Sequence, residues 1–207
     1  MYKRISHQIT EEHFNQPMAA TFEPTSAIQL RASIRNAFGT LVMCGRSYLT
    51  MMSSDEQTAI DMELSKTLTK ISDIINTYYG IAASTDFSSK MEAYVTNIIQ
   101  LVKAINSDND TTDILNNRTA IINDLAALLE RVNPVQWPAL SVVDLLTKIS
   151  EAWVAQATAR KNKDWIADQT AFQQAYSLFV SGEANSPGFA DVLARGIIQQ
   201  FPDLFKI

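Results

Sequence analysis

The sequence predicts an all-α protein: an antiparallel up-and-down helical bundle of about six to seven helices with an irregular N-terminal arm. Apolar residues recur at spacings of three and four along most of the chain from Ala27 onward. Only six glycines and six prolines occur among 207 residues, which favours long helices over turn-rich sheets. The polar segments between the helices are short, so successive helices should lie side by side and run in opposite directions.

Two parts of unequal length are expected. Residues 1–27 contain Pro17 and Pro24 and show no sustained helical period apart from a short turn around Ile9–Phe14, so they are predicted to form an extended N-terminal arm. Residues 28–207 are predicted to form the helical bundle domain. The arm lacks the apolar run of a secretory signal peptide, and no segment approaches the 18 apolar residues of a membrane span.

Helical periodicity, together with residues typical of helix ends, predicts seven helices. Their expected bounds are residues 28–52, 54–79, 86–105, 112–132, 141–160, 164–179 and 186–201.

End signals support the first four of these helices. Ser54 with Gln57 three residues later is typical of a capped helix start, and Gly80 is expected to stop that helix. Asp86 should open the third helix and Thr112 should cap the fourth.

The later helices have their own end signals. The fourth helix should break at Asn133-Pro134, because proline disfavours helix in the residue before it. Ser141 with Asp144 resembles a capping box at the start of the fifth, and Asp164 should begin the sixth. The last helix should start with Ser186 as N-cap and Pro187 in its first position.

Charge and cysteine content exclude several classes of protein. The net charge is −5, with 17 basic and 22 acidic residues, and no basic stripe could neutralise phosphates, so nucleic acid is not an expected partner. Cys44 is the single cysteine, which excludes an intramolecular disulfide and a cysteine-rich zinc site. Its apolar helical surroundings predict a small buried side chain rather than a reactive thiol.

Histidines are too few for the metal centres that helical bundles often hold. His7 and His13 are the only two, and both lie in the arm, where Glu11 and Glu12 accompany them. The Glu-x-x-His pairs of di-iron bundles are absent. We interpret these four residues as surface polar groups, and no metal or other cofactor is expected.

One acidic segment superficially resembles a calcium-binding loop. Asp108–Asp113 carries the acidic spacing, but it lacks the glycine at the sixth position, and Thr119 stands where the twelfth-position glutamate should be. We interpret it as a solvated turn. No phosphate-binding glycine loop, Gly-x-Ser-x-Gly elbow or histidine base in the bundle accompanies it, so no catalytic residue is assigned.

Two carboxylate pairs share a helix face and are weak candidates for acid–base chemistry. Asp164 and Asp168 are four residues apart, and Asp144 and Glu151 are seven apart. Catalytic carboxylates need burial and contrasting environments, so solvated helix faces are the preferred interpretation. Five aromatic residues are likewise interpreted as core and bundle-end packing: Trp137, Trp153, Trp165, Tyr78 and Tyr79.

Several short motifs occur together in a recognisable order. They are Leu30-Arg31, Tyr78-Tyr79-Gly80, Asn133-Pro134 with Trp137-Pro138, Ala159-Arg160, Asp164-Trp165 with Asp168, and Gly196-Ile197-Ile198 followed by Gln200-Phe201-Pro202. In this order they resemble a family of small uncharacterised helical proteins of bacteria and giant viruses, some of which carry an unsupported glycosyltransferase label. The resemblance covers about residues 28–205 and leaves the arm outside.

The resemblance implies the bundle fold and, for this chain, a scaffold without catalytic chemistry. Family members carry histidines in the bundle helices, whereas Ala37, Tyr94, Ile149 and Tyr176 stand at those places here. If the family has a metal or catalytic centre there, this chain lacks it, while it keeps residues of turns and helix ends.

These observations predict a non-enzymatic structural or interaction protein that acts within a larger assembly, with a minor capsid or virion component as its specific form. The expected partners are proteins bound through the N-terminal arm, and the expected location is a virion or the cytoplasm. The alternative is a small-molecule-binding bundle or an unrecognised enzyme of a metal-binding-like family. Its pocket would be lined by Tyr78, Tyr94, Trp153 and Tyr176, with Asp73 or Asp168 as polar contacts.

Overall fold

A computed structural model describes residues 25–51, 53–182 and 186–206 and confirms the all-α class. Six α-helices and a short 3₁₀ helix follow one another: α1 (Thr25–Tyr48), α2 (Ser54–Asn106), α3 (Thr112–Val132), α4 (Ala139–Lys161), α5 (Trp165–Phe179), α6 (Phe189–Gln200) and η2 (Pro202–Phe205). The predicted residues His7, His13, Glu11 and Glu12 lie outside the described part of the chain.

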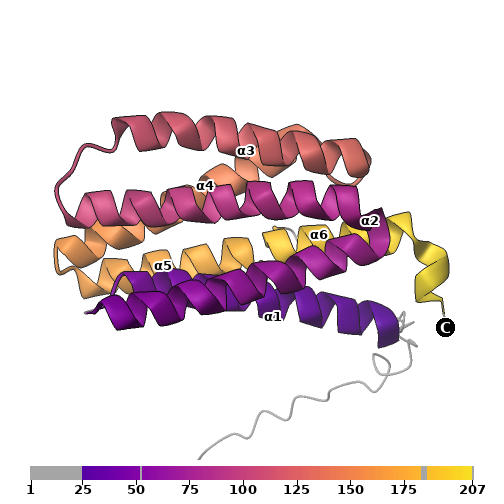
Figure 1. Cartoon of the computed structure of the whole chain (residues 1–207), viewed down its shortest axis with the longest axis horizontal. Helices are drawn as coiled ribbons and strands as arrows, with labels where there is room; N and C mark the ends of the chain where they lie inside the picture. Colours follow the sequence, from indigo (N-terminus) through magenta and orange to yellow (C-terminus); the bar gives the residue numbers. More distant parts are fainter. Residues whose placement is uncertain (1–24, 52, 183–185, 207) are drawn as a thin grey trace, which may run out of the picture.

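The helices run up and down along one common direction, as predicted (Figure 1). α3 and α4 continue this antiparallel order after α2. The predicted alternation is wrong for α5 and α6, which follow one another in the same direction and together run back along α1 (Figure 1). The start of α1, the connection between α3 and α4, and η2 therefore lie at the same end of the bundle (Figure 1).

α2 folds back on itself at a single glycine. Gly80 has φ 80° and ψ 171°, a backbone conformation that side-chain-bearing residues rarely adopt. The two arms of α2, residues 54–79 and 81–106, lie side by side in opposite directions (Figure 1). Ser72 and Ser84 join them, because each hydroxyl bonds the other residue's carbonyl oxygen, at 3.3 and 2.8 Å.

Gly80 thus ends a helical arm as predicted, but the predicted gap before Asp86 is wrong. Residues 81–85 are already helical, so Asp86 lies inside the second arm. The segment Ile81-Ala-Ala-Ser-Thr contains no helix breaker, and the reversal needs only the one residue with positive φ.

The predicted start of α2 is displaced by one residue. Ser53, not Ser54, is the N-cap: its hydroxyl accepts from the Glu56 amide at 3.2 Å, and the Glu56 carboxylate accepts from the Ser53 amide at 3.0 Å. Serine and an acidic side chain at this spacing each accept a hydrogen bond from a backbone amide that has no partner within the helix. The negative charge of Glu56 also interacts favourably with the positive end of the helix dipole, which the neutral Gln57 side chain does less effectively.

Three other predicted starts are also corrected. α4 begins at Ala139 after Pro138, so Ser141 and Asp144 lie within the helix and form no capping box. α6 begins at Phe189 after Gly188, two residues beyond the predicted Ser186 and Pro187 start. Thr111 precedes α3 without a side-chain cap, and the Asp110 carboxylate instead accepts from the amide of Thr112 at 2.9 Å.

The first helix is displaced toward the N-terminus at both ends. α1 begins at Thr25, within the predicted arm of residues 1–27, and ends at Tyr48 rather than Met52. Its apolar face packs into the core as predicted, and Cys44 is buried there. Burial raises the pKa of the Cys44 thiol, and the negative charge of Glu63 raises it further, so the thiolate is disfavoured.

The core is one continuous cluster that draws side chains from all six α-helices and η2. Its largest wholly buried members are Trp137, Tyr94, Phe38, Phe87, Phe189, Ile34, Ile71, Met91, Ile122, Leu125 and Leu129.

Candidate functional site

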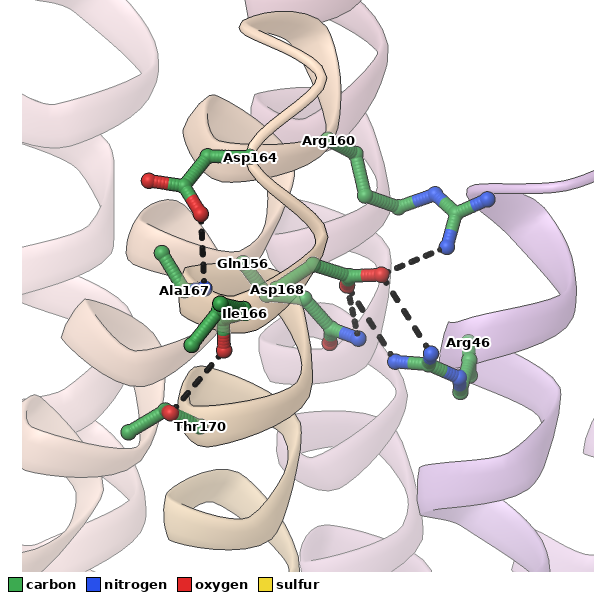
Figure 2. Close-up of polar contacts among 8 residues, drawn as sticks. All are labelled: Arg46, Gln156, Arg160, Asp164, Ile166, Ala167, Asp168 and Thr170. Atoms are coloured by element: carbon green, nitrogen blue, oxygen red, sulfur yellow. Dashed lines mark hydrogen bonds and ion pairs between the residues drawn. The ribbon is translucent and has the colours of Figure 1, made fainter.

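The strongest polar cluster surrounds the carboxylate of Asp168, on the first turn of α5 (Figure 2). Its Oδ1 accepts hydrogen bonds from Nη1 of Arg46 at 3.2 Å and from Nε2 of Gln156 at 3.1 Å. Its Oδ2 accepts from Nη2 of Arg46 at 3.3 Å and from Nη1 of Arg160 at 2.7 Å. The donors come from α1 and α4, so the cluster joins three helices at one buried point.

Local structure at the start of α5 places this carboxylate. Asp164 is the N-cap of α5, and its side chain accepts from the amide of Ala167 at 3.0 Å (Figure 2). Asp168 lies one turn further on, with only 4% of its side chain exposed. The predicted pair therefore has two separate roles: Asp164 caps a helix at the surface, and Asp168 binds two arginines in the interior.

The geometry leaves the Asp168 carboxylate little capacity for other chemistry. An ionised carboxylate offers about four lone-pair positions, and each of its oxygens here already accepts two hydrogen bonds. The Arg46 guanidinium also lies 4.4 Å from the centre of the Phe172 ring, and that of Arg160 lies 5.7 Å from the Trp165 ring. This arrangement orients two cations and one anion for helix packing.

A second ion pair joins α1 to α6. Nε and Nη2 of Arg35 donate to the two oxygens of Asp191 at 2.6 and 2.9 Å, a bidentate geometry. Asp191 lies in the first turn of α6, where a carboxylate also interacts favourably with the helix dipole. Sequence patterns could not pair these residues, because they are 156 positions apart.

The four aromatic residues of the alternative pocket prediction do not gather around one cavity. Tyr94 is wholly buried, and its hydroxyl donates to the Leu146 carbonyl at 2.7 Å. Trp153 packs against Gly45, whereas the Tyr78 ring stacks on Phe205.

Two further members of that predicted pocket, Tyr176 and Asp73, are at the surface. Tyr176 is 39% exposed. Asp73 is exposed and borders an open groove between α1 and the first arm of α2, together with Lys70 and Thr67.

The other predicted carboxylates and aromatic residues have structural surroundings. Asp144 is exposed and pairs with Lys148 at 2.6 Å on the same helix, and Glu151 is exposed as well. Trp137 and Trp153 are buried as predicted, but Trp165 is 59% exposed, so its predicted packing role is wrong. Its ring lies beside the Arg160 guanidinium instead of entering the core.

The acidic segment Asp108–Asp113 forms the turn before α3, as interpreted from the sequence, together with the first two residues of that helix. Asp108 has φ 57° and forms an ion pair with Lys161, while Asp110 bonds the start of α3. The hydrogen bonds from Thr112 lower the pKa of Asp110. Within residues 25–51, 53–182 and 186–206, no three histidine, cysteine or acidic side chains gather as metal ligands would.

The positions aligned with the histidines of the resembling family are mostly interior. Ala37, Tyr94 and Ile149 are buried, and Tyr176 is partly exposed. Tyr94 and the α4 segment around Ile149 are in contact, because the Tyr94 hydroxyl also accepts a hydrogen bond from Ser150 at 3.2 Å. Burial raises the pKa of Tyr94 well above its usual value.

Large apolar side chains are exposed at one end of the bundle, a surface that sequence periodicity missed. They come from the first turn of α1, the Gly80 reversal, the α3–α4 connection, the start of α4 and η2. We call these residues the apolar end; they are Ile28, Ile81, Val135, Leu140 and Leu204, exposed by 52%, 72%, 81%, 87% and 63%, and their segments lie at the same end of the bundle (Figure 1). Other large apolar side chains are exposed elsewhere on the bundle, among them Met62 and Ile166 at 69% and 83%. Isolated exposed apolar residues are ordinary, whereas a contiguous group of them is typical of a contact surface.

Hydrogen bonds through Gln200 join two of the segments at this end of the bundle. The Tyr79 hydroxyl donates to Oε1 of Gln200 at 2.7 Å, and Nε2 of Gln200 donates to the Val132 carbonyl at 3.1 Å. Gln200, the last residue of α6, therefore connects the Gly80 reversal with the end of α3. Burial raises the pKa of Tyr79 to about 12. A side-chain hydrogen bond with Asn133 lowers this pKa, but by less than burial raises it.

Comparisons with protein-family models, with curated proteins and with solved structures gave no match to this chain. Among the described residues, no helix is both long enough and apolar enough to cross a membrane.

Proposed function

We propose that this protein is a non-enzymatic structural or interaction protein and that the apolar end, together with the N-terminal arm, makes its contacts within a larger assembly. The observation that carries this proposal is the exposure of Ile28, Ile81, Val135, Leu140 and Leu204, which belong to segments that lie at the end of the bundle where α1 begins (Figure 1). Burying such side chains against a partner is favourable by about 25 cal/mol for each Å² of apolar surface removed from water.

The use of the polar groups in the bundle supports the same proposal. Asp168, the most deeply buried carboxylate of the predicted pairs, has both oxygens engaged by arginine and glutamine side chains. The Tyr94 hydroxyl bonds a backbone carbonyl, and so does the indole N–H of Trp137, which donates to Val192 at 3.0 Å. Side chains used in this way stabilise packing and leave recognition to the surface.

The resemblance described above favours a virus particle as the assembly, because its family has a viral branch. A minor capsid or virion protein of this kind would require protein partners and no catalytic centre. The alternative, a small-molecule-binding bundle or an enzyme, receives less support, since Tyr78, Tyr94 and Trp153 do not converge on one cavity.

The size and composition of the native complex test this proposal. Gentle purification from the source followed by mass spectrometry should recover the protein in stoichiometric amounts with a large particle. A matched form that lacks residues 1–24 keeps all of α1 and should retain its helicity but lose incorporation. Recovery of the intact protein as a free monomer or small homo-oligomer would contradict the proposal and direct attention to ligands of the bundle grooves.

A further inference from the structure

A polar groove runs between α1 and the first arm of α2, two segments that lie side by side (Figure 1). Its volume of about 410 Å³ is within the usual range for small-molecule sites. Most of the side chains that line it are small or polar. They are Ser33, Asn36, Ala37 and Thr40 of α1, and Thr67, Lys70, Asp73 and Ile74 of α2.

The most buried residue of this lining carries a hydroxyl without a partner. Thr67 is 1% exposed, yet its Oγ1 makes no hydrogen bond in the part of the chain that the structure describes. A buried hydroxyl normally has a partner, because losing water without gaining another hydrogen bond is unfavourable.

Other threonines of the same arm bond within their helix. The hydroxyls of Thr58, Thr69 and Thr77 each donate to the carbonyl four residues earlier, at 3.0, 3.0 and 2.9 Å. Thr67 makes no such bond, so its hydroxyl remains available to a group that binds in the groove.

Two unpaired charges border the groove. Lys70 and Asp73 are three residues apart, a spacing at which helical side chains can pair, as Glu63 and Lys66 of the same arm do at 3.6 Å. Neither of the two forms an ion pair with any residue that the structure describes. The groove therefore presents one ammonium group and one carboxylate whose charges no described side chain neutralises.

These groups define the chemistry of a fitting ligand. A molecule that carries both a carboxylate and an ammonium group can bind Lys70 and Asp73 together, with a charge-assisted hydrogen bond to each. A hydroxyl or amide on the same molecule complements Thr67 and Asn36, whose side chains both donate and accept. Ala37 and Ile74 are the apolar members of the lining, so a large apolar group has little to pack against.

We propose that this groove binds a small, polar α-amino acid in its zwitterionic form. Lys70 binds the carboxylate of the ligand, Asp73 binds its ammonium group, and Thr67 forms a hydrogen bond with its polar side chain. A ligand site of this kind goes beyond the proposed function and does not rest on it.

Titration of the full-length protein with L-serine, followed by two-dimensional amide NMR spectra, tests this proposal. The backbone amides of the lining residues should shift saturably, with one dissociation constant. Three comparison compounds each lack one feature of serine: ethanolamine lacks the carboxylate, glycolate lacks the ammonium group, and L-leucine lacks the polar side chain. Each should bind about tenfold more weakly, because each leaves one polar group of the groove without its partner.

Three substitutions remove the corresponding groups of the protein. Lys70→Gln and Asp73→Asn each remove one charge at an exposed position, and Thr67→Val removes the hydroxyl while preserving the shape of the side chain. Each should raise the dissociation constant for serine about three- to tenfold. Thr67→Val should keep the stability of the native protein in urea denaturation, because the hydroxyl that it removes has no partner to leave unsatisfied.

Lys66→Gln and Thr69→Val are the matched controls, since both positions lie on the same arm but outside the lining of the groove. Both proteins should bind serine as tightly as the native protein does. The absence of a saturable shift with serine would overturn the proposal. Binding of ethanolamine, glycolate or leucine as tight as that of serine would also overturn it, and so would equal affinities in the groove variants and the controls.

These outcomes are distinguishable from those of the test of the proposed function. Serine binding is measured on the purified chain, whereas incorporation is measured on the native complex. A protein that binds serine but is recovered from its source as a free monomer would contradict the proposed function alone. A protein recovered within a large particle that does not bind serine would contradict the ligand site alone.

Discussion

The α-carbon of Gly196 lies directly against the indole ring of Trp137, so that a β-carbon added at position 196 would meet Nε1 at 2.2 Å. Trp137 is wholly buried, and its indole N–H donates to the carbonyl of Val192, which lies on the same helix as Gly196. The Asn133 side chain in turn donates to the Gly196 carbonyl at 3.0 Å. α6 can therefore pack on the α3–α4 connection only because residue 196 has no side chain.

Gly196→Ala should lower the free energy of unfolding by about 1–3 kcal/mol, the usual cost of overpacking a core. Urea denaturation followed by circular dichroism measures this change. Gly39→Ala is the matched control, because it also lies inside a helix but its β-carbon would meet nothing closer than the Tyr176 hydroxyl at 3.9 Å. That control should raise stability by about 0.5–1 kcal/mol through helix propensity. A Gly196→Ala protein as stable as the native one would contradict the described contact.

Asp168→Asn should lower the free energy of unfolding by roughly 3 kcal/mol. The substitution preserves shape but leaves the guanidinium groups of Arg46 and Arg160 without their counter-ion, at a point where 4% of the aspartate side chain is exposed. Denaturant unfolding of Asp144→Asn provides the control, since this exposed carboxylate pairs with Lys148 at the surface and should contribute no more than about 1 kcal/mol. Equal effects of the two substitutions would refute the special role of Asp168.

Gly80→Ala should lower the free energy of unfolding by about 1–3 kcal/mol for a purely conformational reason. A β-carbon at this position would meet nothing within 4 Å, so crowding contributes nothing, whereas φ 80° with ψ 171° is strained for alanine. Adding a methyl group has two effects: it strains a backbone at positive φ, and it raises helix propensity. Gly39→Ala has only the second effect, because Gly39 lies inside a helix, so comparison with this control isolates the strain at position 80. An increase in stability in both proteins would show that position 80 is not held at positive φ.

Alkaline pH should destabilise the fold partly through Tyr79. Burial raises its pKa from 10.0 to about 12, so the unfolded chain loses this proton at a lower pH than the folded chain does. Its stabilising contribution is therefore complete below pH 10 and is lost as the pH rises toward 12. Urea midpoints at pH 9 to 11.5 should fall less steeply in Tyr79→Phe than in the native protein. A parallel fall in both would contradict the assignment, and absorbance at 295 nm reports the ionisation itself.

Periodicity predicted most of the fold because helix faces are a local property of the sequence. The inward residues expected for the helices, such as Ile34, Leu125 and Leu146, are buried. Boundaries were less predictable, since neighbouring residues can serve equally as caps: Ser53 with Glu56 was preferred to Ser54 with Gln57 because an acidic side chain also interacts with the helix dipole. Gly80 was recognised as a helix end, but its sequence did not reveal that helix resumes at once.

The polar cluster and the apolar end depend on contacts between distant parts of the chain. Asp168 was recognised as a candidate, but Arg46 is 122 residues away and no local pattern relates the two. The exposure of Trp165 and of the apolar end likewise could not be predicted from the sequence. The sequence shows that a side chain is apolar, but it does not show whether another helix covers that side chain.

The single-residue reversal at Gly80 also makes chain length critical at that point. An inserted residue there would rotate the second arm of α2 by about 100° relative to the first. Phe87, Met91 and Tyr94, which now face the core, would then point toward other helices or solvent. The segments at 107–111 and 133–138 connect helices without continuing them and can absorb an insertion locally. Related sequences with this fold should therefore vary in length at these two connections and keep the same number of residues around the glycine.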